Sequence, residues 1–566
     1  MLTSYKNAMN PTLSKSGNYN TDQLFVTKMR DEDGNEAYEF KDKIGRVLLT
    51  RQMNGATGHG TYYVYDNFDN LVFVLPPLAA DALTANATWS IESNTVLENY
   101  AYAYRYDHRN RCIYKKLPGA DPVYYRYDKA DRLIFSQDGE QRAENATLWA
   151  FSIPDVLGRI VLQGTCKVTS PDNIANTTAK AEYKENVASG NFRQYGYSVS
   201  GLPVMTDIKV LQVNYYDDYR FKRLSPFSAH SADFGYSTPA GFENKRYGTD
   251  ADLISTKGLL TGSLTALLDY SNELLGSVFY YDKKARLIQA VVANHLGGYE
   301  KEYTNYSFTG LPTWKRLVHY TANYTYKKTS PLTQTYTYLY DHAGRLTETK
   351  LKVGNNSVVS LAKLDYNEIG QLTKKSIHGG KAAMNYTYNI RGWAKSINAP
   401  EFNQILYYNE SYQGNTPRYN GNISAMMYTT GHSTFNNRFH YTYDGLNRLT
   451  ESKYSSSTPL RRGLYNEEMT YNKMGGITQL KRYDFSPYSS APRLIDDLAI
   501  TYAGNQLKRV TEGRTGDPDE GFIAGSNITG DHYVYNKNGA MVQDPNKGIT
   551  DIEYNPLNLP QMIVFA

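Results

Sequence analysis

A short pattern recurs along this 566-residue chain and constrains its fold more than any other feature. Its consensus is two aromatic positions separated by one residue, then Asp or Asn, two variable residues, Gly, Arg and an aliphatic residue. Clear copies begin at Tyr338 and at Tyr441. We count about fifteen copies at spacings of roughly 20–65 residues, which is the range of repeat architectures. The chain is therefore predicted to repeat one small structural unit.

The residue that opens each predicted turn has a short side chain that accepts hydrogen bonds. The fifteen positions are Asp42, Asp66, Asp107, Asp128, Asp155, Asp282, Asp341 and Asp444, then Asn367, Asn389, Asn472, Asn536 and Asn555, and finally Ser198 and Ser307. Such side chains bond to backbone amides inside a type I turn, and they are the residues preferred at its first position.

Three residues further on, all copies but one have a residue that tolerates a left-handed backbone. These residues are Gly45, Gly158, Gly201, Gly310, Gly344, Gly370, Gly392, Gly475 and Gly539, then Asn110, Asn447 and Asn558, and Asp69 and Asp131; the exception is Ala285. A type I turn followed by a left-handed residue is a common hairpin connection. Each copy therefore predicts strand, turn, strand, and Ala285 is expected to be strained or to have a different turn.

An arginine follows the turn in seven copies, at Arg46, Arg111, Arg132, Arg159, Arg286, Arg345 and Arg448. The favoured interpretation is structural, with the guanidinium bonding to turn carbonyls or to the Asp that opens the turn. A ladder of cations that binds a polyanion is the alternative. It is weakened because the other eight copies lack the arginine.

The aromatic pair before each turn places two rings on one face of a strand, as at Tyr386 and Tyr388. Stacked copies would align these rings across neighbouring strands, which stabilises them. A lone hairpin is marginally stable. The array therefore predicts an all-β fold with one long sheet.

Several segments depart from the pattern. Residues 166–195, 225–262, 396–435 and 483–530 are rich in Ser, Asn, Gly and Pro and are predicted to be loops or insertions. Residues 1–21 are predicted to be a polar tail. Short helices are expected within 79–100 and 176–188.

Composition excludes several classes of protein. Fifty-three tyrosines account for much of the nominal apolar content, and the net charge is only +5. Neither a nucleic-acid footprint nor a membrane span is expected. Cys112 and Cys166 make no disulfide framework, and two free thiols are the favoured interpretation.

The repeat resembles the YD repeat of Rhs and teneurin-like proteins, over residues 22–566. The segments 65–77, 116–123 and 294–299 resemble the version found in large secreted proteins of Bacteroidota. The resemblance implies tandem hairpins wound into a spiral, barrel-like hollow shell that encloses a toxin, or an adhesion ectodomain as in teneurins. Family toxins are commonly released by autoproteolysis at a core motif, but the surroundings of Asp544-Pro545 do not match that motif.

A size estimate is compatible with encapsulation. About thirty strands ~4.8 Å apart would make a sheet ~145 Å wide, or a ring roughly 45 Å across. A 100-residue globule, ~34 Å across, would nearly fill that space.

The sequence contains no recognised catalytic motif, and no catalytic, cofactor or metal residues are predicted. His295 and His378 lie beside glycine pairs, as loop residues do. Asp31–Glu36 imitates part of a calcium loop but lacks the glutamate at its twelfth position, so an exposed acidic turn is favoured. Residues 516–521 are interpreted as an acidic loop.

The leading functional hypothesis is a non-enzymatic shell fragment of a secreted or cell-surface polymorphic-toxin protein. Its expected partners are an enclosed toxin or other passenger polypeptide and secretion-system components. The N-terminus lacks the apolar centre of a signal peptide, so an export signal is expected outside this chain, or another export route. The alternatives are an adhesion or glycan-binding scaffold and a polysaccharide-acting enzyme.

Overall fold

The computed structural model describes residues 2–6, 12–83, 88–90, 94–225, 227–228, 231–268, 271, 273–321, 331–431, 436–457, 463–485, 492–514, 521–523, 525 and 530–566. The fold is nearly all β. Two compact units are present: Met1–Tyr124 with Asp138–Ala143 and Tyr386–Ala566, and Tyr125–Gln137 with Glu144–Asn385.

Thirty-one strands belong to one antiparallel sheet, in which neighbours along the chain are mostly neighbours in the sheet. This is the all-β array that the turn pattern predicts. Within the residues that the structure describes, the first strand of this sheet pairs only with the second, and the last only with the one before it. The sheet is therefore not closed by strand pairing.

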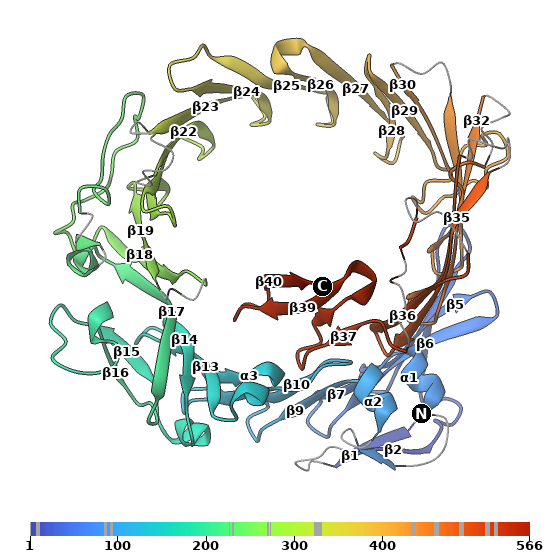
Figure 1. Cartoon of the computed structure of the whole chain (residues 1–566), viewed down its shortest axis with the longest axis horizontal. Helices are drawn as coiled ribbons and strands as arrows, with labels where there is room; N and C mark the ends of the chain where they lie inside the picture. Colours follow the sequence, from blue (N-terminus) through green and yellow to red (C-terminus); the bar gives the residue numbers. More distant parts are fainter. Residues whose placement is uncertain are drawn as a thin grey trace. The chain divides into compact units, whose positions relative to one another are not determined.

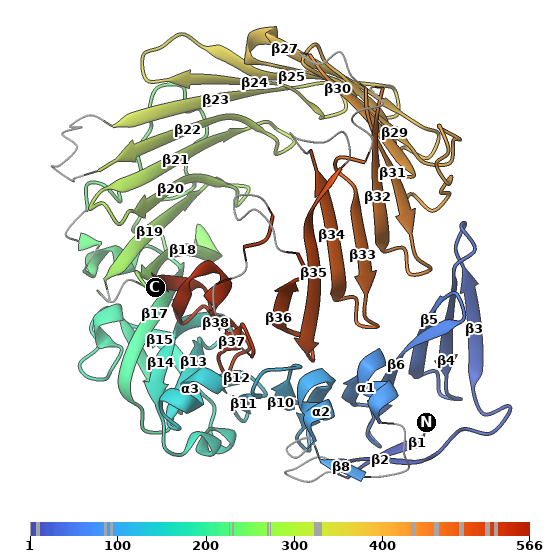
Figure 2. The ribbon, with the colours of Figure 1, turned by 45° about the vertical axis from the view of Figure 1, so that its right-hand side comes forward.

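In the first unit, the early hairpins and the late hairpins are separated by more than 250 residues of sequence. Its early strands are β3 (Phe25–Arg30), β4 (Glu36–Lys41), β5 (Val47–Asn54), β6 (Thr57–Tyr65), β7 (Leu71–Leu75), β9 (Tyr102–Tyr106) and β10 (Cys112–Lys116). Its late strands are β28 (Ala394–Asn398), β29 (Phe402–Tyr407), β30 (Ala425–Thr430), β31 (Asn437–Tyr443), β32 (Leu449–Ser456), β33 (Glu467–Tyr471), β34 (Ile477–Asp484), β35 (Arg493–Ala503) and β36 (Gln506–Glu512). Figure 2 shows β33 to β36 side by side.

The second unit continues the same pairing, and Figure 1 shows β22 to β25 following one another. Its strands are β12 (Leu133–Gln137), β13 (Leu148–Pro154), β14 (Ile160–Lys167), β17 (Thr206–Asp217), β18 (Thr256–Ala266), β19 (Leu274–Tyr281), β20 (Leu287–Ala293), β21 (Tyr299–Tyr306), β22 (Pro312–Tyr320), β23 (Leu332–Tyr340), β24 (Leu346–Val353), β25 (Val359–Tyr366) and β26 (Leu372–Ile377). Two strands, β11 (Val123–Tyr127) and β27 (Ala382–Tyr388), include residues of both units.

Each unit has its own apolar packing. In the first unit, the short helices α1 (Pro77–Ala82) and α2 (Thr95–Tyr100) cover β6 and β7, and Phe73 and Leu97 are fully buried there. In the second unit, aromatic rings form a cluster in which Tyr215 stacks on Phe221 with ring centroids 4.5 Å apart. Burial of these aromatic and aliphatic side chains holds the short helices and turns against the sheet.

The predicted insertions contain more regular structure than their composition indicates. Residues 166–195 include β15 (Lys180–Tyr183), which pairs with β16 (Tyr197–Ser200). The first residues of β18 lie within 225–262, residues 396–435 contain β29 and β30, and residues 483–530 contain β35 and β36. Strands such as β30 and β35 have many apolar residues, including Met426 and Leu498, so the Ser, Asn, Gly and Pro outside the strands dominated the composition of these segments.

Residues 2–6 and 12–17 form strands, where the sequence predicted a polar tail. The strands β1 (Leu2–Lys6), β2 (Thr12–Gly17) and β8 (Thr88–Ser90) form a small sheet. Leu13 is fully buried in the core of the first unit. One apolar residue in a polar stretch is enough to dock it, which a composition argument misses.

One of the two helix predictions is confirmed and the other is wrong. Residues 79–100 overlap α1 and contain α2, but residues 176–188 contain β15 instead. There Ala181 is buried between the exposed residues Lys180 and Glu182, which is the alternation of a strand. A third helix, α3 (Gly139–Glu144), was not predicted. Among the described residues, no helix has both the length and the apolar character needed to span a membrane.

Candidate functional site

Nearly all of the repeated turns contain the same set of hydrogen bonds. In fourteen of the fifteen predicted turns, the opening residue donates its N–H to the carbonyl four residues on and accepts from the N–H three residues on. At Asp341 both bonds are 3.0 Å long. The carboxylate Oδ1 of Asp341 also accepts from the N–H groups of Ala343 and Arg345, each at 2.9 Å. A short acceptor side chain thus holds the whole turn together.

The closing residue has a positive φ at all fifteen positions. Ala285 has φ +58°, and its turn keeps both backbone bonds, each 3.0 Å long. Ala285 therefore adopts the standard turn in a backbone conformation that disfavours a Cβ. Of the two outcomes expected at this position, the structure shows strain and not a different turn.

Ser198 is the one predicted opening residue that opens no such turn. It lies inside β16 and pairs with Glu182 of β15. Two further turns have the full bonding pattern, opened by Asp31 and Asn294. The sequence count missed them because no aromatic residue precedes either one, although both have Gly three residues on. The favoured interpretation of Asp31–Glu36 as an acidic turn agrees with this geometry.

The arginine of the repeat bonds to the Asp that opens its own turn. All seven Nε–Oδ2 distances lie between 2.7 and 3.0 Å, for the pairs Arg46–Asp42, Arg111–Asp107, Arg132–Asp128, Arg159–Asp155, Arg286–Asp282, Arg345–Asp341 and Arg448–Asp444. These guanidinium groups are therefore occupied by the turn, as the structural interpretation of the arginine expected.

The same arginine also reaches the next hairpin. Nη1 of Arg345 donates to the carbonyl of Asn367, which opens the following turn, at 3.1 Å. Its guanidinium lies over the ring of Tyr366, 5.0 Å from the centroid. Arg286 and Arg448 make the equivalent pair of contacts with their own next turns. The arginine thus joins two repeats.

A tyrosine, which in six of eight cases directly precedes a turn, joins repeats in the other direction. Its hydroxyl donates to a backbone carbonyl of the preceding repeat. The acceptor lies five residues after the residue that opens that repeat's turn, as Leu346 follows Asp341. Eight bonds of this kind have lengths between 2.5 and 3.1 Å: Tyr106–Leu71, Tyr306–Leu287, Tyr340–Pro312, Tyr366–Leu346, Tyr408–Ala394, Tyr471–Leu449, Tyr502–Ile477 and Tyr554–Met541. We call this series the tyrosine ladder.

Burial favours the protonated, donating form of several ladder tyrosines. Desolvation raises the pKa of Tyr106 to about 12, and it also raises the pKa values of Tyr471 and Tyr502. The turn carboxylates shift the other way. Burial opposes the charge on Asp282, but hydrogen bonds from Arg286 and the backbone outweigh burial and lower the pKa of Asp282.

Within the first unit, the tips of late hairpins bond to early hairpins. The amide of Gly445 donates to Asn54 at 3.0 Å, and Lys473 pairs with Asp81 at 2.6 Å. The acidic first turn participates as well: Asn447 donates to Asp31 at 3.2 Å, and the N–H of Tyr419 donates to Asp33 at 2.8 Å. Gln506 donates to the carbonyl of Gly119 at 2.7 Å. The array in this unit therefore returns onto its own beginning.

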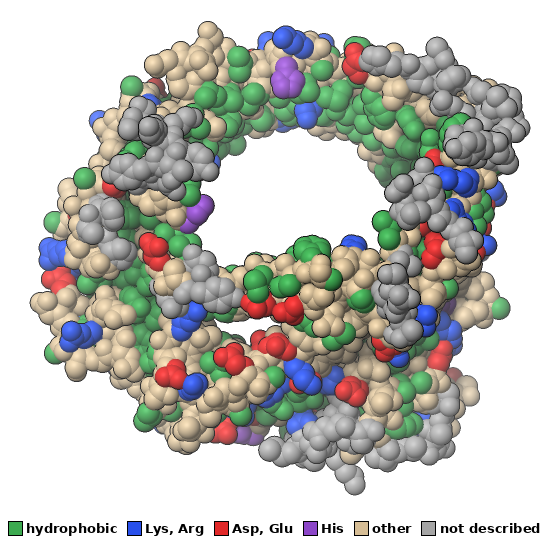
Figure 3. Space-filling model, in the orientation of Figure 1, with side chains coloured by type: hydrophobic (Ala, Val, Ile, Leu, Met, Phe, Trp, Pro, Cys, Tyr) green, Lys and Arg blue, Asp and Glu red, His purple; other side chains and the backbone are tan. Residues whose placement is uncertain are grey.

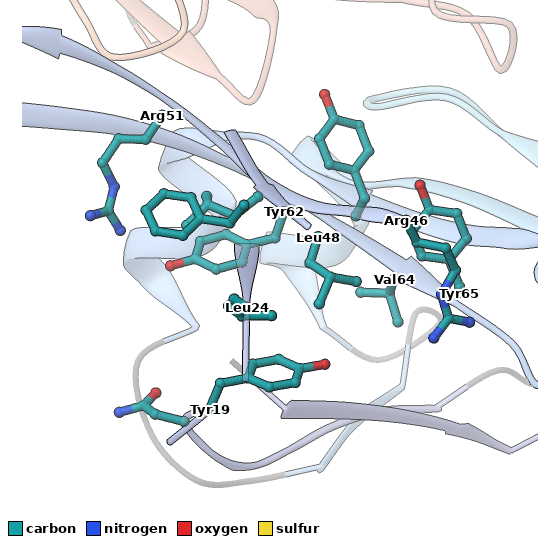
Figure 4. A pocket seen from close by; sticks show the side chains of 12 residues that line it. Tyr19, Leu24, Arg46, Leu48, Arg51, Tyr62, Val64 and Tyr65 are labelled. Carbon is teal, nitrogen blue, oxygen red and sulfur yellow. The ribbon is translucent and has the colours of Figure 1, made fainter. Parts of the chain in front are cut away.

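Two of the pockets in the structure border repeat turns. One, of about 420 Å³, is lined by Tyr19, Leu24, Leu48 and Tyr62, with Arg46 and Arg51 at its ends (Figure 4). The Arg51 guanidinium lies over the ring of Phe40, 5.6 Å from its centroid. This pocket has aromatic and aliphatic walls with an arginine at each end, and its lining includes no carboxylate, cysteine or serine.

The second pocket, of about 480 Å³, brings Asp155, Asp217 and Asp218 together with aromatic rings in the second unit. Its aspartates are bound by arginine: Arg159 holds Asp217 through two bonds of 2.9 and 2.8 Å, and Arg220 holds Asp218 at 2.9 Å. Glu182, which also lines the pocket, pairs with Lys184 at 3.2 Å. The hydrogen bonds from Arg159 lower the pKa of Asp217. These acids are ion-paired, which does not suit them to proton transfer.

The remaining chemistry-bearing residues are dispersed. His295 lies in the turn that Asn294 opens, and His378 begins a 3-10 turn with φ +51°. Neither Cys112 nor Cys166 forms a disulfide, and burial raises the pKa of the Cys166 thiol to about 12. No group of three or more His, Cys, Asp or Glu side chains suited to a metal occurs among the described residues. The acidic loop predicted at 516–521 lies mostly outside them.

Comparison with known proteins gave structural matches only. No protein-family model and no curated protein matches the sequence. The Tc holotoxin pore of Photorhabdus luminescens (TccC3-D651A mutant) matches at 11% identity, covering 94% of this chain and 28% of that one, with a TM-score of 0.32. A TcdB2-TccC3 crystal structure matches at 10% identity, covering 100% and 34%, with a TM-score of 0.20. The chain thus spans about a third of the length of these proteins or less.

Replacement of Ala285 by Gly is expected to stabilise the protein. Glycine adopts positive φ without the penalty of a Cβ, and the gain should be about 1 kcal/mol. Gly344→Ala is the inverse control, because a Cβ there meets only Leu311 at an ordinary 3.5 Å. It should destabilise by a similar amount. Urea unfolding of both variants measures the effect, and a loss of stability in Ala285→Gly would contradict the assignment of strain.

Removal of one ladder hydroxyl, by Tyr366→Phe, is expected to lower the free energy of unfolding by about 1 kcal/mol, because the Leu346 carbonyl loses its donor. Tyr419→Phe is the matched control, since Tyr419 is 46% exposed. Equal effects of the two substitutions on chemical unfolding would refute the ladder.

Acid should weaken the turns. The pKa of Asp341 is lowered in the folded state by hydrogen bonds from Arg345, so its contribution is complete above the unfolded pKa of about 3.9 and is lost as pH falls through the folded value. Asp341→Asn keeps a turn-opening acceptor, as Asn367 shows, but cannot titrate. Below about pH 5 the stability of this variant should fall less steeply than that of the wild type; parallel pH profiles of the unfolding midpoint would contradict the coupling.

Proposed function

We propose that this chain is the wall of a non-enzymatic shell that encloses a toxin or another polypeptide passenger, as part of a secreted or cell-surface protein of the polymorphic-toxin type. The observation that carries the proposal is the use of the repeated polar residues. The turn Asp, the arginine and the tyrosine are all bonded within or between hairpins. Repeated chemistry of this kind builds a continuous surface and leaves no repeated ligand site.

The pockets support the non-enzymatic part of the proposal. The aspartates of the larger of these two pockets are ion-paired with Arg159 and Arg220, and the lining of the other contains no carboxylate, cysteine, serine or histidine. A wall of hydrogen-bonded strands needs neither a cofactor nor a reactive centre. Its partner would be the enclosed polypeptide, and secretion-system components would handle export.

The return of late hairpins onto early ones supports enclosure. Contacts such as Lys473–Asp81 and Gln506–Gly119 join successive layers of the array inside one unit. A single flat sheet would not make contacts between segments nearly 400 residues apart. Layers of this kind are what a wall around a volume requires.

Protease protection tests enclosure directly. A folded reporter of about 100 residues, joined after Ala566 through a protease-cleavable linker, should be cleaved at least tenfold more slowly in the native protein than after unfolding in urea. The same reporter and linker joined before residue 1 is the control and should be cleaved rapidly in both states. Equal cleavage of the two fusions in the native protein would reject enclosure.

A further inference from the structure

The last strand of the C-terminal hairpin has the apolar sequence of an interior strand, but its outer edge has no neighbouring strand among the described residues. The strands of this hairpin are β39 (Ile549–Tyr554) and β40 (Pro560–Phe565), and β40 pairs with β39 alone among the described residues. Four consecutive apolar side chains of β40 are exposed: Met562 by 44%, Ile563 by 47%, Val564 by 38% and Phe565 by 64%. Figure 3 shows hydrophobic side chains on the surface of this hairpin beside acidic ones.

Alternate residues of a strand point to opposite faces, so β40 is apolar on both faces. Strands of this kind are typical of positions buried from both sides, whereas exposed edges usually have charged or polar residues. A two-stranded hairpin is also marginally stable by itself. The edge of β40 is therefore suited to a further strand.

The tyrosine ladder indicates which strand fits there. Tyr535 bonds to Leu507 at 2.8 Å, and Tyr554 bonds to Met541 at 2.6 Å, so the ladder continues into the two C-terminal hairpins, although they lie outside the large sheet. The next acceptor position is Pro560, five residues after Asn555. It has no tyrosine partner in the described part of the chain.

An equivalent position elsewhere in the chain is complete. Pro312 stands five residues after Ser307 and begins β22, and its carbonyl accepts from Tyr340 at 2.7 Å. There β22 pairs with β21 on one side and with β23, the strand that contains Tyr340, on the other. β40 has the counterpart of β21 in β39, but no counterpart of β23.

We propose that β40 binds an antiparallel strand of a hairpin of this repeat type, supplied by another polypeptide, whose turn-preceding tyrosine bonds to the Pro560 carbonyl. The incoming strand would cover the outer edge of β40 and bury its apolar side chains. This inference goes beyond enclosure, and it holds whether or not a passenger is present.

A peptide of residues 437–456, which contains β31, Tyr443, Asp444 and β32, is the probe. Fluorescence anisotropy with the full-length chain should show saturable binding. The Tyr443→Phe peptide should bind about fivefold more weakly, because only the hydroxyl is missing. Hydrogen exchange at residues 562–565 should slow when the probe is bound, a readout that needs no protein variant.

The double variant Ile563→Asp/Phe565→Asp should lose binding while its exchange pattern in β22 to β25 stays unchanged. Four results would overturn the proposal: no binding of the probe, equal binding of a scrambled peptide, equal binding by the double variant, or self-association of the chain through β40 that the probe does not compete with. The last result would assign the edge to a second copy.

Discussion

The structure depends on a short acceptor side chain that satisfies the amides of a five-residue turn. The Oδ1 atom of Asp341 binds two backbone N–H groups, and a left-handed residue then lets the chain reverse. Strand pairing alone gives a marginal hairpin, because the ends of the strands cost backbone entropy to bring together. The turn lowers that cost, and it places Tyr and Arg at fixed positions at the hairpin end.

Fixed positions make connection between repeats possible. Arg345 is held by its own Asp341 and extends to Asn367, while Tyr366 extends back to Leu346 under the same guanidinium. At Arg286, Arg345 and Arg448, neighbouring hairpins are therefore joined by one hydroxyl, one guanidinium and one aromatic face. Such nearest-neighbour terms are what hold repeat proteins together. Copies without arginine, such as those opened by Asn367 and Asn472, keep the turn and the strand pairing.

Much of the fold follows from the sequence because the turn is local. The residues at Asp42 to Arg46 determine a hairpin whatever lies elsewhere in the chain, and the same holds even for the strained Ala285. The turns at Asp31 and Asn294 were detectable by spacing alone. Contacts between distant segments, such as Gly445 with Asn54, follow from no local pattern. The docking of residues 12–17 through Leu13 and the pairing of β15 with β16 depend on surfaces that form only in the fold.

The partnership of tyrosine and arginine across a repeat boundary is the central claim, and a double-mutant cycle measures it most directly. Urea unfolding of Arg345→Ala, of Tyr366→Leu, which removes the ring, and of the double variant isolates their interaction energy. The account predicts a coupling of about 0.5–1 kcal/mol, since the guanidinium lies over the ring that Leu346 orients. Strictly additive effects of the two substitutions would contradict it.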